Sequence, residues 1–150
     1  NLFPIKHYSN PQWNNLHFIW DHLFDLGREI NSPLTEEENT WLDKWAQDLM
    51  DLNPYDKLKP EIDQNWTPES WDDEGFQIVK TFVYTDIKEN EDLPTEYQEE
   101  GRRIVKKRLA LGGYRLANEL KYIFSKQPPS VQNPDLPQNQ KVEVVDMVIH

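Results

Sequence analysis

The chain has 150 residues, a formal net charge of −11 and no cysteine. Its mean hydropathy of −0.87 and its 29% of charged residues argue against a membrane-spanning protein, because a spanning helix needs a long apolar run. The acidic balance argues against a protein that holds nucleic acid on a basic surface, since that mode depends on Lys and Arg neutralising phosphates. Without cysteine, the chain has no disulfide, no thiolate metal site and no thiol nucleophile.

The first predicted helix covers about residues 13–26 and ends before Gly27, with Asn15 as a candidate N-cap. His17 and Asp21 are four residues apart, so a helix places both on one face with Cβ atoms about 5–6 Å apart. Imidazole nitrogen and carboxylate oxygen both bind zinc at about 2.0–2.2 Å, so the two side chains could reach one ion. The same spacing also suits a surface ion pair, and two donors alone do not define a metal site.

Three further helices are expected in the chain. They are a helix after a Thr35 cap that ends at 53–54, a helix that starts with Thr67 as cap and Pro68 at its first position, and a long helix over about 95–124. The polar stretch 56–64 is expected to be a loop, and 83–90 a connection. The sequence therefore predicts an all-α fold.

The long helix carries two features that need an explanation. Gly112 and Gly113 lower helix propensity in its middle and suit either a kink or the close approach of another helix. The helix is also the most basic part of the acidic chain, with Lys106, Lys107, Arg108 and Arg115. A phosphate-binding role is one interpretation of these cations. The better interpretation is that Arg102, Arg103, Lys106 and Lys107 form ion pairs with Glu99 and Glu100 at helical spacing.

The composition changes after residue 125, so we expect two parts, a helical domain over 1–125 and a tail over 126–150. The tail is rich in proline, and its end is rich in β-branched residues, which predicts an extended segment and a terminal strand that could pair with a protein partner. His7 is expected to be a surface residue. Asn65 opens an Asn-Trp-Thr sequon, a weak N-glycosylation site, since Pro68 follows and Thr67 serves equally well as a helix cap.

Three segments resemble motifs of one enzyme family. Residues 15–21 read Asn-Leu-His-Phe-Ile-Trp-Asp and resemble its Asn-Leu-His-x-x-Trp-Asp motif. Residues 66–70 resemble its Trp-x-x-Glu-Ser helix start, and residues 110–120 resemble its closing Ala-Gly-x-Arg-Leu-Ala-x-x-Leu helix. The motifs occur in family order, so the chain resembles, over residues 1–124, the class I single-strand-specific zinc nucleases and 3'-nucleotidases of the S-one/P-one type, related to the zinc phospholipases C.

The resemblance implies a multi-helical zinc nuclease fold of which this chain is the carboxy-terminal part, because Asn1 corresponds to a position in the middle of the family's domain. It implies three zinc ions in the complete domain, one of them bound by His17 and Asp21 together with a ligand lying upstream. The other zinc ligands and the catalytic residues would also lie upstream, so no catalytic residue is assigned in this chain. Zinc in such a site activates water and neutralises charge on the phosphoryl group.

Two interpretations of function remain open. In the first, the chain belongs to a secreted or lumenal zinc nuclease or 3'-nucleotidase that acts on single-stranded DNA or RNA, with the upstream part of the domain joined to it or cleaved but associated. In the second, it is a non-catalytic structural or interaction subunit that derives from the nuclease fold and docks through its tail. The presence of both His17 and Asp21 favours the enzyme.

Overall fold

The computed structural model describes residues 3–6, 14–28, 30 and 32–125. These residues form five α-helices, a short 3-10 turn and a π-helical turn, and no named strand lies among them, which confirms the expected all-α fold. In chain order the elements are α1 (Leu16–Asp21), η1 (Leu23–Asp25), α2 (Glu36–Leu52), α3 (Tyr55–Gln64), α4 (Pro68–Ile78), η2 (Val79–Val83) and α5 (Thr95–Ser125). The predictions for His7, for the tail and for its terminal strand concern residues outside the described ranges.

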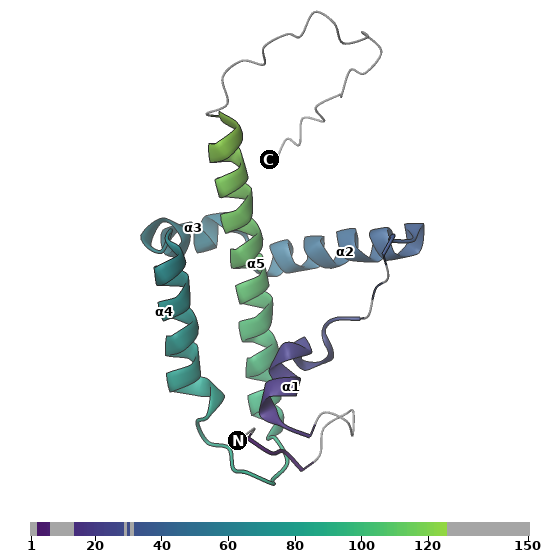
Figure 1. Ribbon diagram of the computed structural model, residues 1–150, viewed down its shortest axis with the longest axis vertical. Helices are drawn as coiled ribbons and strands as arrows, with labels where there is room; N and C mark the ends of the chain where they lie inside the picture. The colour runs from purple at the N-terminus through teal and green to yellow at the C-terminus, as the bar shows by residue number, and fades with distance from the viewer. Residues whose placement is uncertain (1–2, 7–13, 29, 31, 126–150) are drawn as a thin grey trace, which may run out of the picture.

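The long helix α5 is the axis of the fold (Figure 1). Helix α4 runs beside it, α1 lies against its amino-terminal half, and α2 projects from its middle (Figure 1). Two apolar clusters hold these helices together. The larger joins α1, η2 and the first turns of α5, and contains Ile5, Leu16, Ile19, Phe24, Val83, Leu93, Tyr97 and Val105. The smaller joins α3 to the middle of α5, and contains Leu58, Ile62, Ala110 and Leu111.

The helix starts that the sequence predicts are confirmed. Thr35 caps α2 in a capping box with Glu38, whose side chain accepts hydrogen bonds from the Thr35 backbone N–H and hydroxyl. Thr67 caps α4 in the same way with Ser70, and Pro68 occupies the first turn. Each cap satisfies backbone N–H groups that have no partner within the helix. Helix α5 ends at Ser125, one residue beyond the expected position.

The first helix is shorter than predicted. It ends at Asp21, and Leu23, Phe24 and Asp25 take left-handed backbone conformations with φ of 55°, 54° and 65°. Two contacts with α5 stabilise this turn. The Phe24 ring is fully buried over Gly101, and the Phe24 carbonyl accepts a hydrogen bond of 3.1 Å from Arg102 Nε. Burial of the Phe24 ring, worth about 1.5–3 kcal/mol, and the Arg102 hydrogen bond together offset much of a left-handed backbone cost of about 1–2 kcal/mol per residue.

The prediction of a loop over 56–64 is wrong, because this stretch forms α3. Its composition is polar, but Leu58 and Ile62 are four residues apart and are 7% and 4% exposed. Both belong to the apolar cluster that contains Leu111 of α5. A two-residue apolar face gave too weak a periodic signal in the sequence, and Pro60 inside the helix weakened it further.

The expectation of a close helix approach at Gly112 and Gly113 is also wrong. A Cβ at either position would meet nothing within 4 Å, and α5 is helical throughout. The close approach occurs instead at Gly101, where a Cβ would lie 2.4 Å from Phe24 Cζ. Among the described helices, none combines the length and the apolar character that crossing a membrane requires.

Candidate metal centre

The backbone around Asn15 fixes the start of α1. Asn15 is 5% exposed, and its Oδ1 accepts a hydrogen bond of 3.0 Å from the Phe18 backbone N–H, which confirms the predicted cap. The residue before it and the residue after it pair with the amino-terminal segment. The Ile5 N–H donates to the Asn14 carbonyl, and the Leu16 N–H donates to the Phe3 carbonyl, both at 2.9 Å. The first turn of α1 is therefore anchored on both sides.

His17 and Asp21 face outward from this anchored helix. His17 Nε2 and Asp21 Oδ2 are 3.1 Å apart, and the two side chains are 65% and 57% exposed. Two ligands at about 2.0–2.1 Å from a tetrahedral zinc ion are roughly 3.3 Å apart. The pair therefore fits joint ligation of one zinc ion with only a small adjustment of the side chains. The same geometry is also that of an exposed i,i+4 ion pair.

The pair does not complete a metal site by itself. Among residues 3–6, 14–28, 30 and 32–125, no group of three His, Cys, Asp or Glu side chains is arranged to hold a metal ion. Structural and catalytic zinc sites use at least three protein ligands. Any zinc at this position therefore needs ligands from outside the described residues.

The inward face of α1 is held by a chain of two hydrogen bonds. Trp20 Nε1 donates to Tyr97 Oη at 3.1 Å, and the Tyr97 hydroxyl donates to the Val83 carbonyl at 2.8 Å. Burial raises the pKa of Tyr97 to about 12, although the hydrogen bond from Trp20 acts in the opposite direction. The Tyr97 hydroxyl is therefore protonated, and able to donate to Val83, at any pH near neutrality.

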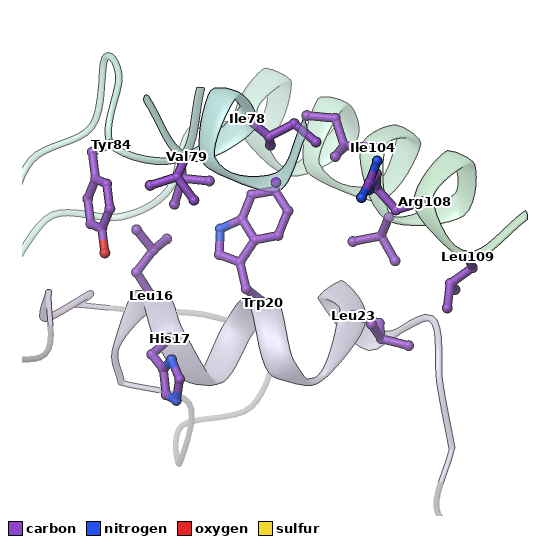
Figure 2. A pocket seen from close by; sticks show the side chains of 13 residues that line it. Leu16, His17, Trp20, Leu23, Ile78, Val79, Tyr84, Ile104, Arg108 and Leu109 are labelled. Carbon is purple, nitrogen blue, oxygen red and sulfur yellow. The ribbon is translucent and has the colours of Figure 1, made fainter. Parts of the chain in front are cut away.

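An apolar groove of about 490 Å³ lies beside α1. Side chains of α1 with η1, of α4 with η2 and of α5 form its walls, and they include Leu16, Trp20, Leu23, Ile78, Val79, Val83, Ile104 and Leu109. Figure 2 shows Leu16 and Trp20 directed toward α4 and α5, whereas the His17 imidazole lies at the edge and points away from them. Arg108 is the cationic residue of the lining. Leu16 and Trp20 thus pack toward the rest of the fold, whereas His17 is directed away from it.

The cations of α5 are engaged in ion pairs. Arg115 Nη1 and Nη2 donate to the Glu74 carboxylate at 2.8 and 2.7 Å, and Arg108 Nη1 donates to the same carboxylate. Lys107 pairs with Glu61 at 2.6 Å. Burial alone would raise the pKa of the Glu74 carboxyl, but the hydrogen bonds and charges of Arg115 and Arg108 outweigh burial and lower it.

These ion pairs confirm one of the expected acidic partners and correct another. An ion pair with Glu100 on the same helix is confirmed for Arg103, at 2.5 Å. For Lys107, however, the acidic partner is Glu61 on α3 rather than a residue of α5. Arg108 and Arg115, for which no partner was predicted, pair with Glu74 on α4. A phosphate would have to compete with Glu61 or Glu74 for these three cations.

Sequence reasoning missed Glu74, which links α4 to two turns of α5. Arg108 and Arg115 are seven residues apart, so they share a helix face, and two cations on a half-buried face require an acidic partner. That spacing was the available signal.

The sequon at Asn65 lies in the turn between α3 and α4, where the Asn65 carbonyl accepts a hydrogen bond of 2.8 Å from Trp71 Nε1. Thr67 acts there as a helix cap, and glycosylation stays a prediction.

The motifs and the all-α fold agree with the comparison to known families. The family model described as S1/P1 Nuclease matches residues 1–125, so the chain belongs to the S1/P1 nuclease family. One relative is Endonuclease 1 of Arabidopsis thaliana, which is 30% identical over 133 residues, covering 83% of this chain and 41% of that protein. The chain thus spans less than half of the length of this relative. No solved structure matches this chain.

Proposed function

We propose that this chain forms the carboxy-terminal part of a zinc-dependent nuclease or 3'-nucleotidase that hydrolyses single-stranded nucleic acid in a secreted or lumenal compartment. The observation that carries the proposal is the pair of donor atoms of His17 and Asp21, 3.1 Å apart and exposed on an anchored helix. Membership in the S1/P1 nuclease family supports the reaction class.

His17 and Asp21 would hold one zinc ion together with an upstream ligand. Zinc supplies Lewis acidity toward phosphoryl oxygens and activates water near neutral pH. The role of this chain is to orient the two donor atoms, through the Asn15 cap on one side and the Trp20 contact on the other. The net charge of −11 makes a local cation necessary for attracting a polyanionic substrate.

The upstream part of the domain is the partner that this function requires. The missing zinc ligands must come from it, and the apolar groove next to His17 supports its association with this chain, because a groove of about 490 Å³ lined by aliphatic side chains is stabilised when apolar residues fill it. We propose a separate role for residues 126–150, the Pro-rich tail, as the binding segment for another protein.

The test uses His17→Ala and Asp21→Asn in the full-length protein. Each variant is expected to lose about one zinc ion per chain by elemental analysis, and to hydrolyse single-stranded DNA roughly a hundredfold more slowly, since loss of one electrostatic stabiliser typically costs 10²–10³ in kcat. Asp63→Asn is the matched control. Asp63 has the same 57% side-chain exposure as Asp21 and pairs with Lys59 four residues away.

The control is expected to keep the zinc content and the rate of the wild-type protein. An unchanged zinc content in both the His17 and Asp21 variants would remove the pair from the metal site. That outcome, together with no hydrolysis by the wild-type protein, would favour the structural or interaction subunit instead.

A further inference from the structure

Helix α1 is too short to define its own orientation. It has six residues, whereas isolated helices shorter than about 12–15 residues are marginal in water. The direction in which His17 and Asp21 point is therefore set by the contacts that α1 makes with the rest of the chain. Its start is held by the Asn15 cap, and its second turn is held by the half-buried contact of Trp20.

Trp20 lies three residues after His17 and directly before Asp21, so any rotation of its side of the helix moves both donor atoms. Its indole N–H donates to Tyr97 Oη at 3.1 Å. The same hydroxyl donates at 2.8 Å to the carbonyl of Val83, the last residue of the π-helical turn η2. That carbonyl lies at a helix end, where backbone groups lack an intrahelical partner.

The hydroxyl of Tyr97 is itself held in a fixed place. Tyr97 is 6% exposed, and its ring stacks on Phe82 of η2 with a centroid distance of 4.7 Å and an interplanar angle of 10°. The Phe24 ring lies 6.3 Å away on another side. The Tyr97 hydroxyl both accepts and donates a hydrogen bond. Its removal would leave the Trp20 indole N–H and the Val83 carbonyl without this partner, so the hydroxyl is a suitable anchor.

We propose that Tyr97 is a positioning residue for the His17–Asp21 pair, acting through Trp20 to fix the orientation of α1 against η2. The proposal rests on the zinc-binding role given above. The spacing between the two donors is internal to α1, so Tyr97 controls where the pair lies relative to the upstream ligand. The ligands of a metal site must be held within about 0.5 Å and 10–20° of the geometry that binds the ion.

Tyr114 provides a matched control on the same helix. Its hydroxyl also donates to a backbone carbonyl, that of Asn53, at 3.1 Å, and its ring also contacts another aromatic ring, that of Tyr55, although edge-on rather than stacked. Tyr114 binds the α2–α3 connection rather than α1. A Tyr→Phe change at either position removes one hydroxyl from α5, but only the change at Tyr97 frees Trp20.

The experiment measures zinc release from full-length Tyr97→Phe, Tyr114→Phe and His17→Ala proteins during titration with a chromogenic chelator. Tyr97→Phe is expected to release the ion that His17→Ala lacks at about tenfold lower chelator concentration than wild type, the low end of the roughly 10–100-fold effect of groups that orient metal ligands. Tyr114→Phe should release zinc like the wild-type protein. Trp20→Phe should reproduce the Tyr97→Phe shift, and the double variant should add little to it.

The outcomes separate this inference from the proposed function. If His17→Ala keeps the full zinc content, the zinc role of the pair fails and the inference fails with it. If His17→Ala loses zinc but Tyr97→Phe releases it like the wild-type protein, only the inference is overturned. An equal shift in Tyr114→Phe would also overturn it, since the effect would then come from general loosening of α5.

Discussion

Gly101 is the position in α5 where a single methyl group should do the most damage. A Cβ there would lie 2.4 Å from Phe24 Cζ and 2.8 Å from both Cε atoms, whereas carbon atoms in contact are about 3.5–4.0 Å apart. The Phe24 ring is completely buried and packs edge-on against Trp20 at 4.9 Å, so it cannot move toward solvent. In Gly101→Ala, the ring or the whole of η1 must therefore shift by about 1 Å.

The expected cost follows from two opposing effects. Overpacking of a core typically costs about 1–3 kcal/mol, and a displacement of this size belongs at the upper end. Replacing a helical glycine by alanine contributes about 0.5–1 kcal/mol in the other direction. The net loss in the free energy of unfolding of Gly101→Ala is therefore about 2 kcal/mol.

Chemical denaturation of the full-length protein checks this value, with Gly112→Ala and Gly113→Ala as controls. A Cβ at either control position meets nothing within 4 Å, so both controls are expected to gain stability, by up to about 1 kcal/mol each. The same substitution on one helix thus has opposite signs at different positions. If Gly101→Ala proves as stable as the controls, the packing of Phe24 against α5 is wrong.

Two further predictions concern charge and capping. The folded-state pKa of Glu74 is lowered, so its contribution to stability is present above its ordinary pKa of 4.5 and is lost as pH falls through the lower folded value. Glu74→Gln should therefore lower the free energy of unfolding by about 3 kcal/mol at pH 7, because it leaves Arg115 buried without its carboxylate. The variant should also lose less stability than the wild-type protein as the pH falls below 4.5. Glu100→Gln, at an exposed ion pair, should cost under about 1 kcal/mol. Asn15→Ala removes the acceptor of the Phe18 N–H and should cost about 1 kcal/mol by denaturation, with Asn15→Asp restoring most of it.

The features that the sequence predicted well are those that depend on neighbouring residues. The caps at Thr35, Thr67 and Asn15 each need only a side-chain oxygen and a backbone N–H about three residues further on. The all-α class and the length of α5 followed from periodicity over many residues. Local rules therefore predicted most element starts.

The features that the sequence could not predict depend on contacts across the fold. The end of α1 at Asp21 is fixed by Gly101 and Arg102, about 80 residues away in the sequence, which favour a left-handed turn at Phe24. The helix at 55–64 exists because α5 offers an apolar surface to Leu58. Tertiary packing overrides local propensity in both places.

The Asn-Leu-His-x-x-Trp-Asp motif gains a physical meaning from this structure. Asn15 caps the helix, Leu16 is 2% exposed, and Trp20 donates to Tyr97, so three of the five defined positions hold α1 in place. Of the five defined positions, only His17 and Asp21 project outward. Because a six-residue helix has little stability of its own, the placement of these two donors depends on α5, and zinc retention should report on packing at Tyr97 as well as on the ligands themselves.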